Sequence, residues 1–131
     1  MRTIKFRGKH GKEWAYGSLV CLTDAEIYLI DEKEVCVDTI GQYTGFKDVN
    51  GTDIYEGDIL KNAFSDKPFG VVEWSIYGGY YYINCSVVPY NWYNSYRPLG
   101  EMLDVKIDGK PVNLEVIGNV YDDPELFKKE K

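Results

Sequence analysis

Short runs of alternating hydrophobic and polar residues dominate the chain, and turn-forming residues separate them. Ile4 and Phe6 alternate with Lys5 and Arg7, which is the period of a half-buried β-strand. We expect further strands at residues 14–21, 26–30, 34–38, 58–61, 69–77, 80–88, 104–107 and 112–120. Many short strands with closely spaced turns are typical of a barrel or a sandwich.

Glycine-containing segments mark the expected turns, which lie at residues 8–11, 50–51, 78–79 and 108–109. Asn50-Gly51 favours a type I′ hairpin, since both residues tolerate a positive φ. No interior segment has the pattern of a long helix. At the end of the chain, Asp123 can cap a helix and Pro124 suits the first helical position. A short C-terminal helix is therefore predicted from Pro124.

The composition gives the size and net charge of the chain and shows an excess of aromatic side chains. The 131 residues suit one average domain or two very small ones, and the 44% hydrophobic and 27% charged fractions are ordinary for a soluble protein. Twelve tyrosines raise the aromatic fraction to 15%, and tyrosine favours strands and interfaces. The net charge of −6 disfavours duplex nucleic acid as the partner, because phosphate binding needs clustered Lys and Arg.

The spacing of the cysteines and the hydropathy of the chain indicate in which cellular compartment the protein is expected. Cys21, Cys36 and Cys85 are odd in number and include no CxxC, so a disulfide framework and a zinc site are disfavoured. We expect them to be small buried side chains in a reducing cytoplasm. The N-terminus lacks the apolar stretch of a signal peptide, and no segment approaches 18 apolar residues.

Candidate chemistry is sparse. Residues 48–53 have the composition of a calcium loop, but the EF-hand spacing fails, and a hairpin turn explains them better. Glu56 and Asp58 would share one side of an extended chain, either as paired carboxylates or as part of a solvated turn in which Asp58 binds nearby amides. His10 is the only histidine and has no assignable nucleophile. The sequence therefore indicates no catalytic, metal-binding or cofactor-binding residue.

The densest pattern is aromatic. Seven rings precede Arg97 within a short segment: Tyr80, Tyr81, Tyr82, Tyr90, Trp92, Tyr93 and Tyr96. Tyr80 and Tyr82 share one face of a strand while Tyr81 takes the other, so the rings exceed what one buried face needs. They can cover the open end of a barrel, form a protein interface, or stack single-stranded bases. Arg97 is the only basic residue among them, which disfavours the last use.

Three segments resemble the YopX family of phage and prophage proteins. They are IKFRGKHGKEWAYGSLV at residues 4–20, IGQYTGFKDVNGTDIYEGDIL at 40–60 followed by GVVEW at 70–74, and EVIGNVYDDPEL at 115–126. The resemblance implies an all-β fold with a small SH3-like barrel on the C-terminal side, phage or prophage origin, and a cytoplasmic location in a bacterial host. It implies no established activity, so no catalytic residue is transferred.

The middle segment also has a folding explanation. Its glycines suit turns or close backbone approaches at positions 41, 45, 51 and 57. Five of its apolar residues can fill a core: Tyr43, Phe46, Ile54, Tyr55 and Ile59.

These observations combine into one expectation. The chain is an all-β protein, with residues 1–45 as an N-terminal β segment packed on a barrel formed by residues 46–131 with a short C-terminal helix. It is expected to be a non-enzymatic protein-binding or assembly module, with a nucleic-acid-binding barrel as the alternative. Its partner would be an unknown protein or a second copy, with no cofactor and no membrane. The expected interaction surface comprises Tyr80, Tyr82, Tyr90, Trp92, Tyr93, Tyr96 and Arg97.

Overall fold

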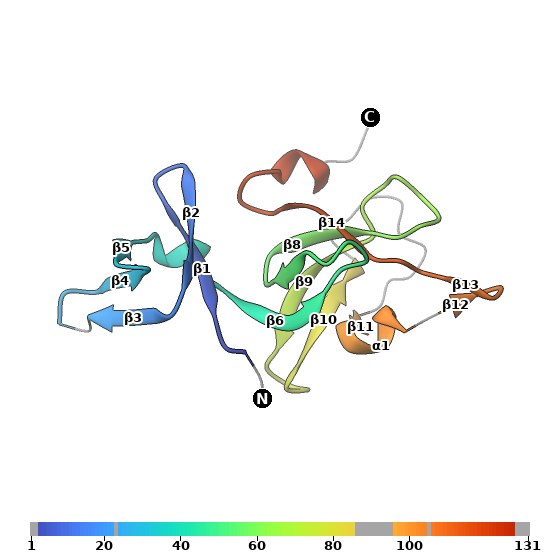
Figure 1. The fold of residues 1–131 in the computed structure, drawn as a ribbon, viewed down its shortest axis with the longest axis horizontal. Helices are drawn as coiled ribbons and strands as arrows, with labels where there is room; N and C mark the ends of the chain where they lie inside the picture. The colour runs from blue at the N-terminus through green and yellow to red at the C-terminus, as the bar shows by residue number, and fades with distance from the viewer. Residues whose placement is uncertain (1–2, 23, 86–95, 105, 128–131) are drawn as a thin grey trace. The chain divides into compact units, whose positions relative to one another are not determined.

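The computed structural model describes residues 3–22, 24–85, 96–104 and 106–127, and they are mostly β (Figure 1). Three antiparallel sheets and a two-stranded ribbon account for the strands. The chain divides into two compact units, residues 1–45 and 46–131. Strand β6 (Gly41–Lys47) begins in the first unit and ends in the second.

The first unit is built from two small groups of strands. In one group, β1 pairs with β2 and with the start of β6; in the other, β4 lies between β3 and β5. Its own strands are β1 (Phe6–His10), β2 (Glu13–Gly17), β3 (Leu19–Leu22), β4 (Ile27–Ile30) and β5 (Lys33–Glu34). Ala15, Ile30 and Val35 form its buried core. This core is small, because most neighbouring apolar side chains are only partly buried.

Two predicted strands of the first unit are corrected. The expected strand at residues 14–21 is broken into β2 and β3 at Gly17, which adopts a φ of 146° that side chains disfavour. The expected strand at 34–38 ends at Glu34, and a 3-10 helix, η1 (Val37–Thr39), follows. The reason is local: the amide and the hydroxyl of Thr39 both donate to the carbonyl of Cys36, which closes a tight turn.

The second unit contains a five-stranded sheet that curls into a half-barrel, with the order β11-β10-β9-β8-β14 (Figure 1). Its strands are β8 (Asp58–Lys61), β9 (Gly70–Ser75), β10 (Tyr80–Asn84), β11 (Tyr96–Pro98) and β14 (Glu115–Asn119). Strand β7 (Asp53–Tyr55) pairs with β6, and β12 (Lys106–Ile107) forms a ribbon with β13 (Lys110–Pro111). The order has two ends, at β11 and β14, so the SH3-like barrel implied by the resemblance is not confirmed.

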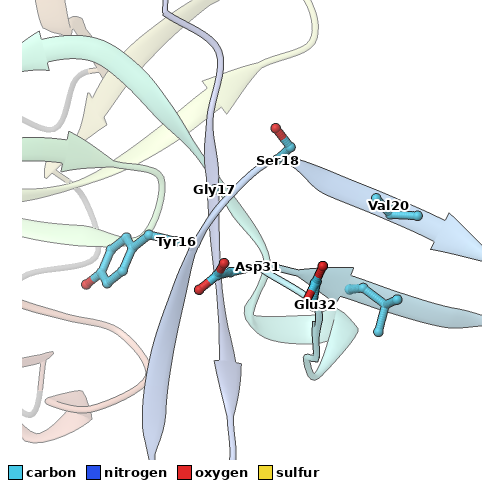
Figure 2. A pocket seen from close by; sticks show the side chains of 7 residues that line it. Tyr16, Gly17, Ser18, Val20, Asp31 and Glu32 are labelled. Carbon is cyan, nitrogen blue, oxygen red and sulfur yellow. The ribbon is translucent and has the colours of Figure 1, made fainter.

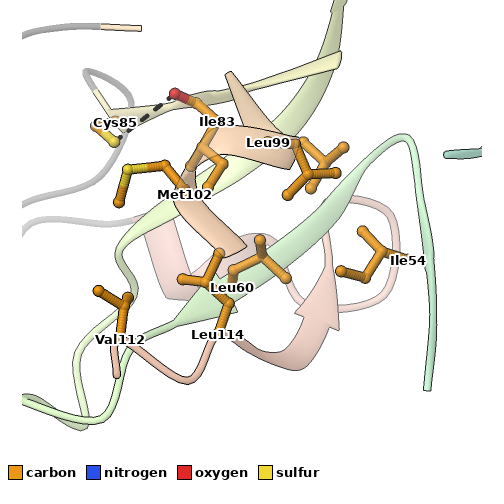
Figure 3. Packing of buried hydrophobic residues seen from close by; sticks show 9 residues of the cluster. Ile54, Leu60, Ile83, Cys85, Leu99, Met102, Val112 and Leu114 are labelled. Atoms are coloured by element: carbon orange, nitrogen blue, oxygen red, sulfur yellow. Dashed lines mark hydrogen bonds between the residues drawn. The ribbon is translucent and has the colours of Figure 1, made fainter. Parts of the chain in front are cut away.

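The core of the second unit lies on the inner side of this curled sheet. Helix α1 (Leu99–Leu103), which the sequence did not indicate, supplies Leu99 and Met102 to it (Figure 3). The two side chains are three positions apart, so they share one face of the single turn. The buried members are Ile54, Leu60, Val72, Ile83, Cys85, Leu99, Met102, Val112 and Leu114. This cluster, rather than any polar site, organises residues 46–131.

The hairpin at Asn50-Gly51 is confirmed, but its turn type is corrected. Gly51 has a φ of 84°, whereas Asn50 does not have a positive φ, so the turn is not type I′. The amide of Asp48 donates to Thr52 and the amide of Gly51 donates to Asp48, which gives a longer loop. The type I′ signature, positive φ at both residues, occurs instead at Asp108-Gly109.

The C-terminal helix from Pro124 is present as a 3-10 helix, η3 (Pro124–Phe127). Four of the five core residues expected from the middle segment are buried, but Phe46 is 39% exposed and is a correction. Of the three free cysteines, only Cys85 is buried; Cys21 and Cys36 are exposed, contrary to expectation. Within the described residues, no helix has the length and hydropathy needed to span a membrane.

Candidate interaction surface

The structure describes only part of the predicted aromatic surface. Tyr80 and Tyr82 lie on β10, whereas Tyr90, Trp92 and Tyr93 fall outside the described residues. The backbones of Tyr96 and Arg97 belong to β11, where they pair with Asn84 and Ile83. The side chains of Tyr96 and Arg97 are also outside the described part. The surface can therefore be built from β10 and from its partner strand, β9.

The end of the β9–β10 hairpin stands clear of the rest of its sheet. Strand β8 pairs with β9 only through Gly70 and Val71, and β11 pairs with β10 only from Tyr82 onward. Residues 73–81, called here the aromatic arm, are therefore flanked by no other strand among the described ones (Figure 1). The arm is not open on every side, since Tyr81 is half-buried and packs against the core of the second unit, whereas the opposite residue, Trp74, is 46% exposed.

The two faces of the arm are built differently. On one face, Trp74 and Tyr81 are directly opposite and their rings meet edge to face, with centroids 4.8 Å apart. On the other face, Glu73 at the base of the arm binds two residues of the adjoining sheet: its carboxylate accepts the hydroxyl of Tyr82 over 2.7 Å and the side-chain amide of Asn84 over 3.1 Å. Tyr82 is therefore tied into the sheet through its polar end.

The outer part of the arm is apolar and open to solvent. The exposed fractions are 46% for Trp74, 78% for Ile76, 96% for Tyr77 and 43% for Tyr80. The ring of Tyr80 lies over Gly78, since a Cβ added there would come within 2.7 Å of the ring atom Cδ2. Glycine at this position thus lets the ring fold back over the turn. Trp74 and Tyr80 point to opposite faces of this hairpin end, and Ile76 and Tyr77 lie in its turn.

Sequence reasoning missed Trp74, Ile76 and Tyr77 as members of this surface. The signal was present: residues 69–77 are apolar at both odd and even positions, so a strand there cannot bury all of them on one face. Charge is scarce in the same stretch. From residue 69 to residue 84 the only charged residue is Glu73, and its carboxylate binds Tyr82 and Asn84.

The other candidate residues serve the fold. The carboxylate of Asp48 accepts the amides of Asn50, Thr52 and Val116 at 2.8–2.9 Å. Asp58 is buried rather than solvated, and its carboxylate accepts the amide of Tyr55. These two carboxylates are directed at backbone amides, which fits a structural role.

The Glu56–Asp58 pair belongs to the second unit and His10 to the first. Gly57, between the two acidic residues, has a φ of 90°, so they belong to a turn rather than to one face of an extended strand. His10 belongs to the other unit, and its Nδ1 donates to the carbonyl of Glu34 over 2.8 Å. Within the described parts of the chain, no group of three or more His, Cys, Asp or Glu residues could hold a metal ion.

Residues 5–128 match the family described as YopX protein, which is nearly the whole chain. The chain belongs to the YopX family. A solved structure similar to this YopX protein is the crystal structure of protein EF1440 from Enterococcus faecalis, with 20% sequence identity and a TM-score of 0.58. The match covers 98% of this chain and 100% of that chain, and at this identity it shows a shared fold alone.

No curated protein sequence matches this YopX protein.

Proposed function

We propose that this YopX protein is a non-enzymatic protein-binding or assembly module of phage or prophage origin, and that the aromatic arm is its contact surface. The observation that carries the proposal is the exposure of four large apolar side chains at one hairpin end. Tryptophan and tyrosine dominate interface hot spots, because they bury a large area at little conformational cost. The occupant of the arm is a protein, either a second copy or another chain.

The scaffold supports this use of the arm. The curled sheet of the second unit is consistent with an SH3-like barrel that is open between β11 and β14, and we include that architecture in the proposal. The arm extends from β9 and β10, two adjacent inner strands of this sheet. Their side chains Val72 and Ile83 are fully buried. A rigid base reduces the entropy lost when the rings bind.

A nucleic-acid-binding role is the alternative, and the charges around the arm disfavour it. Exposed rings can stack single-stranded bases, but such sites combine rings with a positively charged groove. Residues 69–84 contain neither lysine nor arginine, and the chain as a whole carries a net charge of −6. The rings therefore fit a protein surface better than a phosphate backbone.

Site-specific photocross-linking tests the proposal in the bacterium that carries the gene. The photoreactive residue p-benzoylphenylalanine replaces Tyr77 and, as the control, the exposed Phe64 outside the arm. We expect one discrete adduct from position 77, lost when Ile76→Ser is added, and none from position 64. Light scattering on the purified protein shows whether the adduct corresponds to a second copy.

Two outcomes would contradict the proposal. One is a monomer that gives no adduct at position 77 beyond that at position 64. The other is binding to a single-stranded oligo(dT) that Tyr77→Ser abolishes and that weakens with added salt, which would assign the arm to nucleic acid.

A further inference from the structure

A second apolar surface lies in the first unit, on the outer face of the three-stranded sheet β3-β4-β5. Opposite residues of paired strands point to the same side, and β3 pairs with β4 through Val20 opposite Leu29 and Leu22 opposite Ile27. The alternate pair, Leu19 and Ile30, faces the core of the unit. The outer face, called here the β3–β4 face, is therefore formed by Val20, Leu22, Ile27 and Leu29.

This face is accessible to solvent. Val20 is 49% exposed and Leu22 is 45% exposed, while Ile27 and Leu29 are half-buried. At one end of the face, a hollow of about 340 Å³ is lined by Tyr16, Val20, Leu29, Asp31 and Glu32 (Figure 2). An apolar sheet face of this kind can dock an extended or amphipathic segment.

Carboxylates border the β3–β4 face on three sides. Asp31 and Glu32 form the tight turn at one end, with φ values of 52° and 62°. Asp24 and Glu26 lie in the connection between β3 and β4 at the other end, and Glu34 lies opposite Leu29 on β5. All five are exposed. An apolar centre with an acidic border on both ends is complementary to an apolar segment flanked by basic residues.

The same charges argue against a second copy of this chain on the β3–β4 face. A symmetric dimer places the same patch on both subunits, so each acidic border would meet an identical acidic border. Like charges across an interface are unfavourable. We propose that the β3–β4 face binds a protein segment with an apolar centre and Lys or Arg at each end. This surface shares no residue with the aromatic arm.

A synthetic probe tests the proposal on the full chain. The probe is a fluorescent peptide, Lys-Lys-Leu-Val-Leu-Val-Lys-Lys, with two controls: one with glutamate in place of every lysine, and one with Ser and Thr in place of the apolar centre. Fluorescence anisotropy should detect binding of the first peptide and of neither control. Binding should weaken between about 0.01 M and about 1 M salt, since the contacts at the border are screened.

Two variants locate the contact. The double variant Val20→Thr with Leu22→Gln removes apolar groups from the face and should weaken binding by about tenfold or more, in line with the loss of central contacts. The double variant Asp31→Asn with Glu32→Asn removes two charges, while asparagine keeps the positive φ of the turn. It should also weaken binding. Val37→Thr, at another exposed valine of the unit, is the matched control and should bind as wild type.

Every other result overturns the proposal. Equal binding of the charge-reversed or the Ser/Thr peptide would show nonspecific adsorption, and unchanged binding by both double variants would place the contact elsewhere. A dimer that Val20→Thr with Leu22→Gln dissociates would make a second copy the occupant. Circular dichroism confirms that each variant is folded. The variant Tyr77→Ser should bind the peptide as wild type, so this test is independent of the aromatic arm.

Discussion

Asp48 ties two distant parts of the second unit together through one buried carboxylate. Its Oδ1 accepts the amides of Asn50 and Thr52 within the β6–β7 loop, and its Oδ2 accepts the amide of Val116 in β14. Three amide donors on one carboxylate are strong, charge-assisted contacts. In residues 48–53, which have the composition of a calcium loop, the carboxylate of Asp48 thus has a structural role, because it binds three backbone amides.

Asp48→Asn should therefore destabilise the protein. The side-chain amide presents hydrogen to at least one of the three amide donors, so a buried donor loses its acceptor. We expect a loss of about 1–3 kcal/mol in the free energy of unfolding, measured by urea denaturation. Asp66→Asn, at an exposed position, is the control and should change the stability little. Equal stabilities for both variants would contradict the role of the carboxylate.

Tyr82 and Tyr77 should respond differently to substitution, although both are tyrosines of the β9–β10 region. Tyr82→Phe removes a hydroxyl that donates to Glu73, so we expect a loss of about 1 kcal/mol in stability. Tyr77 is 96% exposed, so Tyr77→Ser should leave the stability nearly unchanged and remove the photocross-linked adduct at a neighbouring arm position. Thermal denaturation and cross-linking separate the two effects. A stability loss from Tyr77→Ser would contradict the description of the arm as solvent-exposed.

At the scale of elements, two glycines show that close approach of neighbouring atoms and a positive φ are separate reasons why a position requires glycine. Gly70 in β9 has an ordinary φ, but a Cβ there would collide with a methyl group of Ile83 and come within 3.1 Å of the Asn84 carbonyl oxygen. Gly51 has a φ of 84° and no atom within 4 Å of an added Cβ. The first position requires space and the second requires a left-handed backbone.

Gly70→Ala should destabilise the protein by about 1–3 kcal/mol or more through overpacking against β10. Gly51→Asn should cost far less, because asparagine tolerates the left-handed region and meets open space. Chemical denaturation of the two variants measures the difference. If Gly51→Asn were the more damaging substitution, the close approach of β9 and β10 at Gly70 would be contradicted.

Turn chemistry explains which elements the sequence could predict. Residues 58–61 form a strand as expected, and Asp108-Gly109 reverses the chain with positive φ at both positions. Asn50-Gly51 has the same local signature, yet the carboxylate of Asp48 holds the loop in another geometry. A dipeptide cannot reveal those contacts, since Asp48 lies outside it and the same carboxylate also binds the amide of Val116, 68 residues further along the chain. Long-range bonds of this kind override local propensity.

The sequence pattern could not predict helix α1, and it predicted the aromatic arm only in part. A five-residue helix is too short to show a period, and only its packing of Leu99 and Met102 into the core defines it. Alternation did reveal that Tyr80 and Tyr82 share a face. It could not reveal where β8 and β11 stop pairing, and that endpoint is what exposes Trp74 and Tyr77.

At the scale of the whole molecule, the two units have very different cores. The buried cluster of residues 46–131 has nine members, whereas that of residues 1–45 has three, Ala15, Ile30 and Val35. Domains of about 40 residues seldom fold without disulfides, metals or partners. The first unit also has only free cysteines.

We therefore expect the fragment 46–131 to unfold cooperatively on its own and the fragment 1–45 to be unfolded in isolation. Circular dichroism during thermal denaturation of each fragment, with the full chain as reference, tests this. A cooperative transition in the isolated fragment 1–45 would show that its three-residue core suffices.

The different exposure of the three thiols allows opening of the larger core to be measured by thiol labelling. Cys21 and Cys36 are exposed, while Cys85 is fully enclosed among the side chains of the larger core. A maleimide reagent should accordingly label Cys21 and Cys36 rapidly. It should label Cys85 only at the rate at which the core opens to solvent. With alanine in place of Cys21 and Cys36, intact-mass spectrometry over time would convert the remaining single tagging rate into an opening rate for the half-barrel interior, with no added probe.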